Sequence, residues 1–525
     1  MRSGSFFPAV AFATMIAGCT VTPRSFPPAA IETVREGGRV VERRYDVDGD
    51  GRADRAETLD PQSGGVRAMA LDADGDGTME RRVEVRYPRA SRVSDAPDLK
   101  DGETGSEPVA QQPVGQQRQP KRHLFIISDS IPPDIVADLH AQGRLAYFHR
   151  PTRIVSPFPV MTDPCLAEFF GVSPVPGVEA QYFDGQRLSD APNLYLREGN
   201  APWMKCVDYH LPISDHAFAY VYPDKWFKHG LGKLQEAFEA SDQETFLVYM
   251  VGTSCTGSKR GRTGHVESLI QYDRLFQELM FRYEGRLDIT LMSDHGHHCA
   301  DYRRMSIVRN LERAGYRPGA TLNGPQDLVI PEWGLVSMIA IYAQTPAVAA
   351  DAVNLGGVEL AAFVDGDAVM VLSRDGQARI SRDGARYRYE MLRGDPLQLE
   401  AIASALRAGG QLDPSGFGDA DAWWNATKEH VFPDPLARLW RAFHGLFQNV
   451  PTVLLSLEDG FSAGSPKLDE FIDMAAVHGS LRAPSSEGMI LSTLTELPPI
   501  VRMAELRGML KSREVAIEPR GARSD

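Results

Sequence analysis

A short apolar segment that ends in an acid and a histidine constrains the fold of this chain more than any other feature. Residues 287–292 read Leu-Asp-Ile-Thr-Leu-Met, and the Ser-Asp-His-Gly sequence that follows contains Asp294 and His295. The length and composition of the segment indicate a buried strand. Open α/β sheets bind their ligands at the carboxyl ends of such strands. A carboxylate and an imidazole placed there are typical ligands of a divalent transition metal.

Two further segments carry polar side chains in comparable positions. The apolar residues 124–127 predict a second strand, which is followed by Ser128 and Asp129. Residues 158–164 read Phe-Pro-Val-Met-Thr-Asp-Pro and lead into a predicted helix over 165–170. Thr162 therefore lies near the start of a helix, where backbone N–H groups favour a phosphoryl group. The alternative role of Thr162 is that of an ordinary helix N-cap.

In this order the motifs resemble those of the alkaline phosphatase superfamily, and specifically its type I phosphodiesterase/nucleotide pyrophosphatase branch. The resemblance covers residues 124–510 and includes a late His-Gly pair at His478. It implies an α/β core with a doubly wound, mostly parallel sheet. It also implies a Thr162 nucleophile and a site for Zn²⁺ or another divalent transition metal. The implied ligands are Asp129, Thr162, Asp294 and His295, with His478 as a ligand of a second ion.

The chain departs from the family at that second ion. After the apolar residues 246–251 the family carries Asp-x-x-x-His, whereas this chain has Ser254 and Ser258. Two neutral hydroxyls do not replace a carboxylate and an imidazole as ligands of a transition metal. The first metal site is expected to be complete, and the second is in doubt. His265 is expected at the surface, and a role as substitute ligand is the alternative.

Other residues near these motifs have weaker assignments. Gln181 lies near a family Asn that contacts a phosphate oxygen, and its amide is able to donate the same bond. The cations at 259, 260 and 262 are expected in a solvated loop, with partial replacement of the missing metal charge as the alternative. The residues that follow His295 are expected at the rim of the substrate site, namely His297, His298 and Cys299.

The resemblance implies a metal-dependent phosphoester hydrolase, either a phosphodiesterase or a phosphatase. Thr162 would attack phosphorus, and water would then hydrolyse a phospho-threonine intermediate. The two serines leave open the alternative of a non-catalytic lipoprotein that binds a metal or ligand. A transferase of phospho-head-groups is a further alternative, which does not rest on the serines. The substrate is expected to be a small phosphorylated molecule. A net charge of −14 argues against long nucleic acid as a partner.

The amino terminus predicts an anchored envelope protein. Residues 1–18 have the pattern of a signal peptide, with an apolar stretch too short to span a bilayer. The sequence Ile-Ala-Gly-Cys resembles a bacterial lipobox, which implies cleavage before Cys19 and lipidation of its thiol. Residues 19–38 would then form a lipidated tether at the periplasmic face, and Thr20 favours the outer membrane. The alternative is an ordinary signal peptide with an incidental cysteine.

Four cysteines remain after Cys19, an even number that suits an oxidising compartment. Three pairings are open to them. Two of the cysteines follow putative central strands at the same end of the sheet. This favours a disulfide between Cys255 and Cys299, with a second between Cys165 and Cys206.

Residues 39–88 predict a small β module with calcium loops. Two Asp-x-Asp-Gly-Asp-Gly sequences match the spacing of loops that wrap Ca²⁺ in oxygen ligands, although their flanks alternate like strands. The second loop has Val83 where the first has its final acid. The predicted ligands are Asp46, Asp48, Asp50, Asp54 and Glu57 in the first loop, and Asp72, Asp74 and Asp76 in the second.

The remaining segments complete the predicted domain organisation. Residues 89–122 are polar and Pro-rich, as expected of a disordered linker. The alkaline-phosphatase-like domain would span residues 123–510, with a tail at 511–525. Asp-Gly turns between alternating apolar runs over 358–390 predict an antiparallel meander within an insertion at about 316–450. Helices are expected to follow, and Trp423 and Trp424 to pack between them rather than stack a substrate base.

Overall fold

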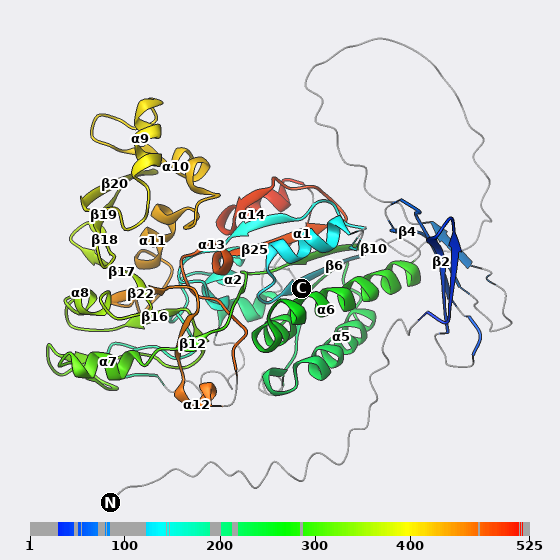
Figure 1. Cartoon of the computed structure of the whole chain (residues 1–525), viewed down its shortest axis with the longest axis horizontal. Coiled ribbons are helices and arrows are strands. Elements are labelled where there is room, and N and C mark those ends of the chain that lie inside the picture. The colour runs from blue at the N-terminus through cyan, green and yellow to red at the C-terminus, as the bar shows by residue number, and fades with distance from the viewer. Residues whose placement is uncertain are drawn as a thin grey trace, which may run out of the picture.

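The protein has a mixed α/β architecture with several separate sheets (Figure 1). The computed structural model describes residues 30–84, 122–189, 201–212, 219–283, 287–513, 515 and 517, apart from residues 47–50, 54, 63, 72–78, 80, 143, 146, 471 and 472. None of the helices in these ranges is long and apolar enough to cross a membrane. The signal peptide, Cys19 and nearly all of the predicted linker lie outside the described residues.

The central sheet has seven strands in the order β26-β7-β25-β10-β6-β9-β8. Strands β10, β6, β9 and β8 run parallel, β25 runs antiparallel to both of its neighbours, and β26 is parallel to β7. The bounds are β6 (Arg122–Ser128), β7 (Thr152–Val155), β8 (Tyr209–His210), β9 (Thr245–Met250), β10 (Leu287–Met292), β25 (Glu487–Ser492) and β26 (Ile500–Arg502).

Helices cover both faces of this sheet because the side chains of a strand alternate between its faces. Ile126 and Val248 share one apolar cluster with α1 (Pro133–Ala141), α5 (Pro223–Ala240) and α6 (Gly252–Arg282). Phe125 and Leu247 share another with α2 (Thr162–Phe170), the 3₁₀ turn η1 (Pro202–Cys206) and α14 (Met503–Lys511). Strands whose side chains are apolar on both faces therefore form the middle of three layers.

A second, antiparallel sheet has the order β16-β22-β17-β18-β19-β20-β21. The meander predicted over 358–390 corresponds to β17–β20. The bounds are β16 (Met338–Ile341), β17 (Val358–Asp365), β18 (Ala368–Leu372), β19 (Gln377–Asp383), β20 (Arg386–Arg393), β21 (Gly418–Asp419) and β22 (Val453–Leu457).

Helices α8 (Val348–Ala352), α9 (Glu400–Ala408), α10 (Ala420–Thr427) and α11 (Pro435–Phe443) accompany this sheet. Trp423 and Trp424 belong to α10 and are buried, as expected of packing residues. The indole N–H of Trp423 donates to the Tyr387 carbonyl at 3.0 Å. The second sheet therefore has its own core, which includes Trp423 and much of α11.

Short elements connect the two sheets. Two small sheets have two strands each, β11 (His298–Cys299) with β24 (Ala476–Val477) and β13 (Arg317–Pro318) with β14 (Asp327–Leu328). A third has three strands, in the order β12 (Arg303–Arg304), β23 (Phe461–Gly464) and β15 (Leu335–Val336). The accompanying helices are α7 (Ile307–Arg313), α12 (Pro466–Asp469) and α13 (Ala483–Ser486).

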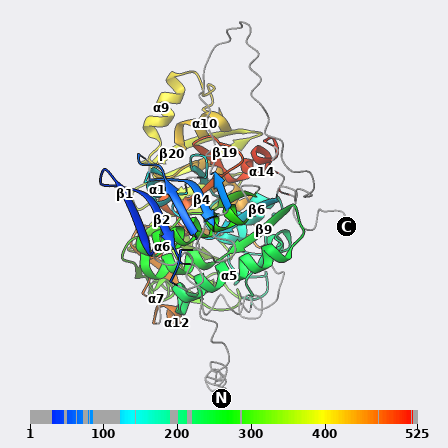
Figure 2. The ribbon, with the colours of Figure 1, turned by 90° about the vertical axis from the view of Figure 1, so that its right-hand side faces the viewer.

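The amino-terminal module is a five-stranded antiparallel sheet, shown in blue in Figure 2. Its strands are β1 (Glu32–Glu36), β2 (Arg39–Tyr45), β3 (Arg55–Leu59), β4 (Val66–Leu71) and β5 (Arg81–Glu84). Strand β1 lies in the segment assigned above to a tether, so the module begins earlier than predicted. Leu59, Val66 and Met69 share an apolar cluster with α1 and α6, so the module packs against the main body of the protein.

The first calcium loop differs from its prediction at Glu57. This carboxylate is buried in the module and accepts hydrogen bonds from Tyr45 at 2.8 Å and Arg55 at 2.6 Å. Both of its oxygens are used in this way, so its assignment as a calcium ligand is wrong. Asp46 accepts from the Gly51 backbone N–H at 2.8 Å. The other predicted ligands of both loops lie outside the described residues.

Candidate functional site

Two neighbouring strand ends create the centre of the candidate site. Strands β6 and β10 pair in parallel with Ile127 opposite Met292, so the residues that follow them meet at one edge of the sheet. Asp129, Asp294 and His295 are all buried there, and one ligand atom from each lies within 4.8 Å of the others. His295 Nε2 is 3.3 Å from Asp294 Oδ2 and 3.8 Å from Asp129 Oδ1.

Thr162 reaches the same place from the first turn of α2. Its hydroxyl oxygen lies 3.5 Å from His295 Nε2, and the residue is partly exposed. Met161 is the N-cap residue, and Thr162 is already helical. The simple alternative of Thr162 as an N-cap is therefore wrong. The hydroxyl of Thr162 is instead directed to the group formed by the two aspartates and His295.

The electrostatics of this group suit a bound cation. Burial, together with the nearby Asp129 carboxylate, raises the pKa of Asp294 well above its usual range. Asp294 Oδ2 is buried without a hydrogen-bond partner among the described residues. Burial lowers the pKa of His295, so its ring is neutral and offers a lone pair. Oxygens from Asp129, Asp294 and Thr162 with one imidazole nitrogen form a donor set that fits a divalent transition metal.

Two residues that the sequence did not indicate hold Asp129 in place. Tyr249 donates its hydroxyl to Asp129 Oδ2 at 2.7 Å, and the Ser130 hydroxyl donates to Oδ1. Ser130 has a φ of 62°, which is unusual for a residue with a side chain. Its backbone N–H donates to Asp294 Oδ1 at 3.2 Å, so this conformation links the two carboxylates. No sequence pattern identifies Ser130, although its position at a strand end agrees with such a role.

Hydroxyl groups lie at the predicted place of the second metal. Ser254 and Ser258 are buried on α6. Ser254 Oγ is 3.4 Å from Ser130 Oγ and 3.3 Å from the Tyr220 hydroxyl. The ring of His478 stacks on that of His295 with 4.1 Å between centroids. Its Nδ1 is 2.8 Å from the Val160 carbonyl oxygen, two residues before Thr162.

The expectation that His265 is a surface residue is wrong. Its side chain is fully buried, and its Nε2 lies 3.1 Å from Nδ1 of His297. The cause is a kink in α6 at Gly261, which has φ 56° and ψ −139°. The kink turns the second part of the helix so that His265 faces Gly257 in the first part. A helical wheel assumes a straight helix, so the sequence pattern did not reveal this change of direction.

The three cations near the serines do not replace a metal charge. They belong to α6 rather than to a loop. Lys259 donates to the Val221 carbonyl at 3.0 Å, and Arg260 pairs with Asp224 at 2.7 Å and Glu267 at 2.6 Å. Arg262 pairs with Asp134 and Asp138, at 2.5 Å each. These three side chains are therefore held by partners near the surface and are not directed to the metal site.

Gln181 is placed by a contact outside the site. Its side-chain carbonyl accepts from the Glu332 backbone N–H at 3.2 Å. Phosphate binding by its NH₂ group stays a prediction.

Both predicted disulfides are wrong, because all four described cysteines are free. Cys165, Cys206 and Cys255 belong to one apolar cluster between the sheet and α2. Burial raises the pKa of the Cys165 and Cys255 thiols well above the usual range, as expected of inert core residues. Cys299 lies in the separate strand β11. Strand ends alone did not show that the Cys255 side chain turns into the core.

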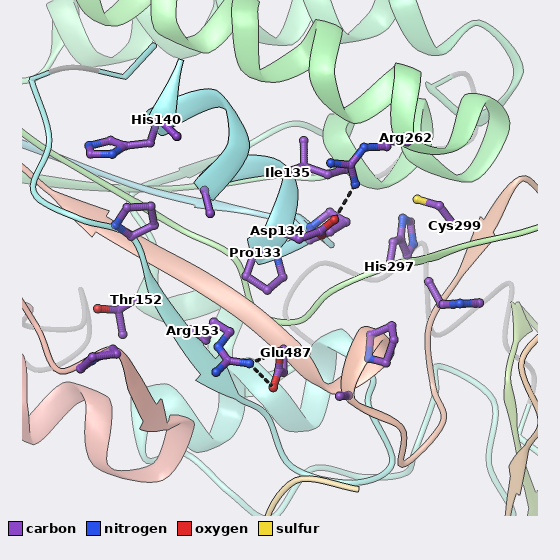
Figure 3. Close-up of a pocket in the computed structure, with 18 of the residues that line it drawn as sticks. Pro133, Asp134, Ile135, His140, Thr152, Arg153, Arg262, His297, Cys299 and Glu487 are labelled. Atoms are coloured by element: carbon purple, nitrogen blue, oxygen red, sulfur yellow. Dashed lines mark hydrogen bonds and ion pairs between the residues drawn. The ribbon is translucent and has the colours of Figure 1, made fainter. Parts of the chain in front are cut away.

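A cavity of about 850 Å³ lies on another side of the same loops (Figure 3). Asp134, Arg262, Cys299 and Glu487 contribute to its wall, together with His297 and His298. His298 and Cys299 line this cavity and Thr162 does not, and their place at the rim of the Thr162 site stays a prediction. His297 is only 3% exposed and is better described as part of the interior.

Comparison with solved structures finds likenesses of low score and low sequence identity. No protein-family model and no curated protein matches the sequence. Murine ectonucleotide pyrophosphatase/phosphodiesterase 5 matches with a TM-score of 0.39 at 12% identity, covering 77% of this chain and 97% of that chain. The human protein matches with a TM-score of 0.41 at 12% identity, covering 76% and 96%.

An inactive variant of the murine protein in complex with AMP matches with a TM-score of 0.38 at 11% identity, covering 77% and 97%. Because all three TM-scores are low, the residues of the site, rather than these likenesses, support the function proposed below.

Proposed function

We propose that the protein is a metal-dependent phosphoester hydrolase with Thr162 as its nucleophile. The observation that carries the proposal is the convergence of Asp129, Thr162, Asp294 and His295 from three separate segments. These are the four positions that the resemblance to the alkaline phosphatase superfamily assigns to one metal. Asp294 Oδ2 accepts no hydrogen bond from the described residues, so it is available as a ligand of such an ion.

The residues of the chain have distinct parts in this reaction. A bound divalent ion would supply Lewis acidity and lower the pKa of the Thr162 hydroxyl. The Thr162 oxygen would attack phosphorus as its proton passes to water, the P–O bond to the ester alcohol would break, and the alcohol would leave after taking a proton from solvent. The backbone N–H groups in the first turn of α2 would favour the negative charge of the phosphoryl group. Tyr249 and Ser130 would keep the Asp129 carboxylate oriented. Water would then hydrolyse the phospho-threonine, which regenerates the free hydroxyl.

The test compares Thr162→Ala and Thr162→Ser with the wild type on bis-p-nitrophenyl phosphate and p-nitrophenyl phosphate. We expect Thr162→Ala to lower kcat by at least about 10³-fold, because a nucleophile has no substitute in a covalent mechanism. Thr162→Ser keeps the hydroxyl and should keep measurable turnover. Equal turnover by the wild type and Thr162→Ala would refute the assignment of Thr162 as the nucleophile.

A non-catalytic binding protein is the second candidate, favoured by the hydroxyl cluster of Ser254, Ser130 and Tyr220. Hydroxyl groups in hydrogen bonds with one another stand where the family has a carboxylate and an imidazole. A wild type that binds metal without hydrolysing either ester would support this candidate. A phospho-head-group transferase would instead need an alcohol acceptor for turnover.

Anchoring in the envelope through lipidated Cys19 belongs to the same proposal. We expect the wild type to fractionate with membranes and Cys19→Ala to lose most of that association, because an acyl chain supplies about 0.8 kcal/mol per buried CH₂. The measurement is immunoblotting of separated envelope and soluble fractions. Membrane association that is unchanged in Cys19→Ala would exclude lipidation of this thiol as the anchor.

A further inference from the structure

The cavity of about 850 Å³ beside α1 has the properties of a second binding site (Figure 3). Its volume lies within the range of about 300–1,000 Å³ that is typical of sites for small molecules. Neither Thr162 nor the three residues of the metal site contribute to its wall. The cavity is therefore separate from the site of the proposed hydrolysis.

The wall of the cavity is largely apolar and rigid. One face of α1 forms one side of it, with Ile135, Ala137 and Ala141. Five prolines from separate segments add to the apolar surface, namely Pro132, Pro133, Pro151, Pro484 and Pro499. Proline has a fixed φ and no backbone N–H, so this surface is preformed and offers few hydrogen-bond donors. A ligand with an apolar body fits such a wall.

The arginines and acids of the wall leave one positive charge. Three arginines stand against two acids, namely Arg150, Arg153, Arg262, Asp134 and Glu487. Arg262 pairs with Asp134, and Nη1 of Arg153 lies 3.3 Å from both carboxylate oxygens of Glu487 (Figure 3). The charge that remains is that of Arg150. Because the whole chain has a net charge of −14, a wall with excess positive charge is an exception that favours an anion.

Two guanidinium groups of the wall have N–H donors to spare. Arg150 is exposed and makes no hydrogen bond or ion pair with the described residues. Arg153 lies three residues later, in β7, and uses only its Nη1, so its Nε and Nη2 have no partner in the described part of the chain. The hydroxyl of Thr152, between them, already donates to the Pro498 carbonyl at 2.8 Å. Guanidinium N–H groups bind a carboxylate through parallel, charge-assisted hydrogen bonds.

We propose that this cavity binds an organic carboxylic acid in its anionic form. The carboxylate would pair with Arg150 and Arg153, and the apolar body would lie against α1 and the prolines. A carboxylate has a single negative charge, which matches the one positive charge of the wall. A phosphate monoester has a charge of about −1.5 to −2 at neutral pH and would leave negative charge without a partner.

Isothermal titration calorimetry of the full chain with octanoate tests the proposal. The wild type should bind octanoate at least about 10-fold more tightly than 1-octanol, which lacks the charge, and than acetate, which lacks the apolar body. Arg150→Gln/Arg153→Gln should weaken octanoate binding by at least about 10-fold, because the carboxylate loses its charged donors. The matched control is Arg309→Gln/Arg313→Gln, which removes two exposed arginines of α7 outside the cavity and should keep the wild-type affinity.

Two further variants protect the test against misfolding and against binding at the metal site. Ala137→Phe keeps both arginines and fills part of the cavity from an exposed position of α1, so it should also weaken octanoate binding. Asp294→Asn changes the metal site and should bind octanoate as the wild type does. The proposal would be overturned by a wild type that does not bind octanoate, by wild-type affinity in the Arg150→Gln/Arg153→Gln variant, or by loss of binding in Asp294→Asn. Since no ester is hydrolysed in these titrations, the result does not depend on Thr162 acting as a nucleophile.

Discussion

At the scale of single residues, function depends on polar side chains that the fold removes from water. Asp294 and His295 are two such side chains. Burial raises the pKa of the Asp294 carboxyl and lowers the pKa of the His295 imidazole. Both shifts reflect a buried carboxylate and a buried imidazole, whose charge and lone pair a bound cation would use. Glu179 is a third case near α2, where burial raises the pKa of its carboxyl to about 7, although its Oε2 accepts from the Gly334 N–H at 3.0 Å.

Glu179 predicts a specific dependence of stability on pH. Its carboxyl binds a proton more tightly in the folded protein, with a pKa of about 7 against 4.5. The folded state therefore holds more protons between these values, and stability falls as the pH rises through 7. Relative to the wild type, Glu179→Gln should become more stable between pH 5 and 8, by at most about 2 kcal/mol given the partial exposure of Glu179.

Thermal or urea unfolding at several pH values measures this difference. The exposed Glu312→Gln is the control, because it removes a carboxyl that already lies in water. Parallel stability curves for the wild type and Glu179→Gln would contradict the raised pKa.

At the scale of elements, the kink of α6 decides which residues reach the site. The two parts of this helix contact each other through glycines on either side of Gly261. A Cβ at Gly264 would lie 2.2 Å from the Thr256 carbonyl oxygen. The close approach brings His265 against Gly257 and thereby next to His297.

Two glycine-to-alanine substitutions separate this contact from helix propensity. Gly264→Ala should lower stability by about 1–3 kcal/mol, because the added methyl group has to push the two parts of α6 apart. Gly232→Ala, in α5, meets nothing within 4 Å and should raise stability by at most about 1 kcal/mol. Chemical denaturation of both variants measures their free energies of unfolding. Equal changes of the same sign would contradict a steric contact at Gly264.

At the scale of the whole molecule, Arg502 joins the second sheet and its helices to the central sheet. It lies in β26 and pairs with Asp434 at 2.8 Å and with Asp421 at 2.9 Å. Its guanidinium also lies 4.6 Å from the centre of the Trp424 ring. These partners come from α10 and from the N-cap of α11, so one side chain connects the two parts of the domain.

A double-mutant cycle tests this connection. Arg502→Met should cost about 3–5 kcal/mol, because the buried Asp434 carboxylate loses its partner. Adding Asp434→Asn should recover part of that loss, since no buried charge then remains. Additive effects in unfolding measurements would indicate that the two side chains act independently.

The sequence determined the parts of this protein that depend on local pattern. Runs of apolar residues located β6, β9 and β10. Asp129, Asp294 and His295 directly follow two of these strands and were therefore predicted as metal ligands. Asp-Gly turns located the meander of β17–β20. Such features follow from the side chains of neighbouring residues, so a single segment is enough to predict them.

Only the tertiary structure decided which distant side chains meet. It placed Ser130 and Tyr249 on Asp129, turned Cys255 into the core without a disulfide, and brought His265 to His297 across a helix kink. The physical reason is that these contacts depend on helix direction and on packing between layers. Both are set by the burial of the whole core, and no segment contains that information by itself.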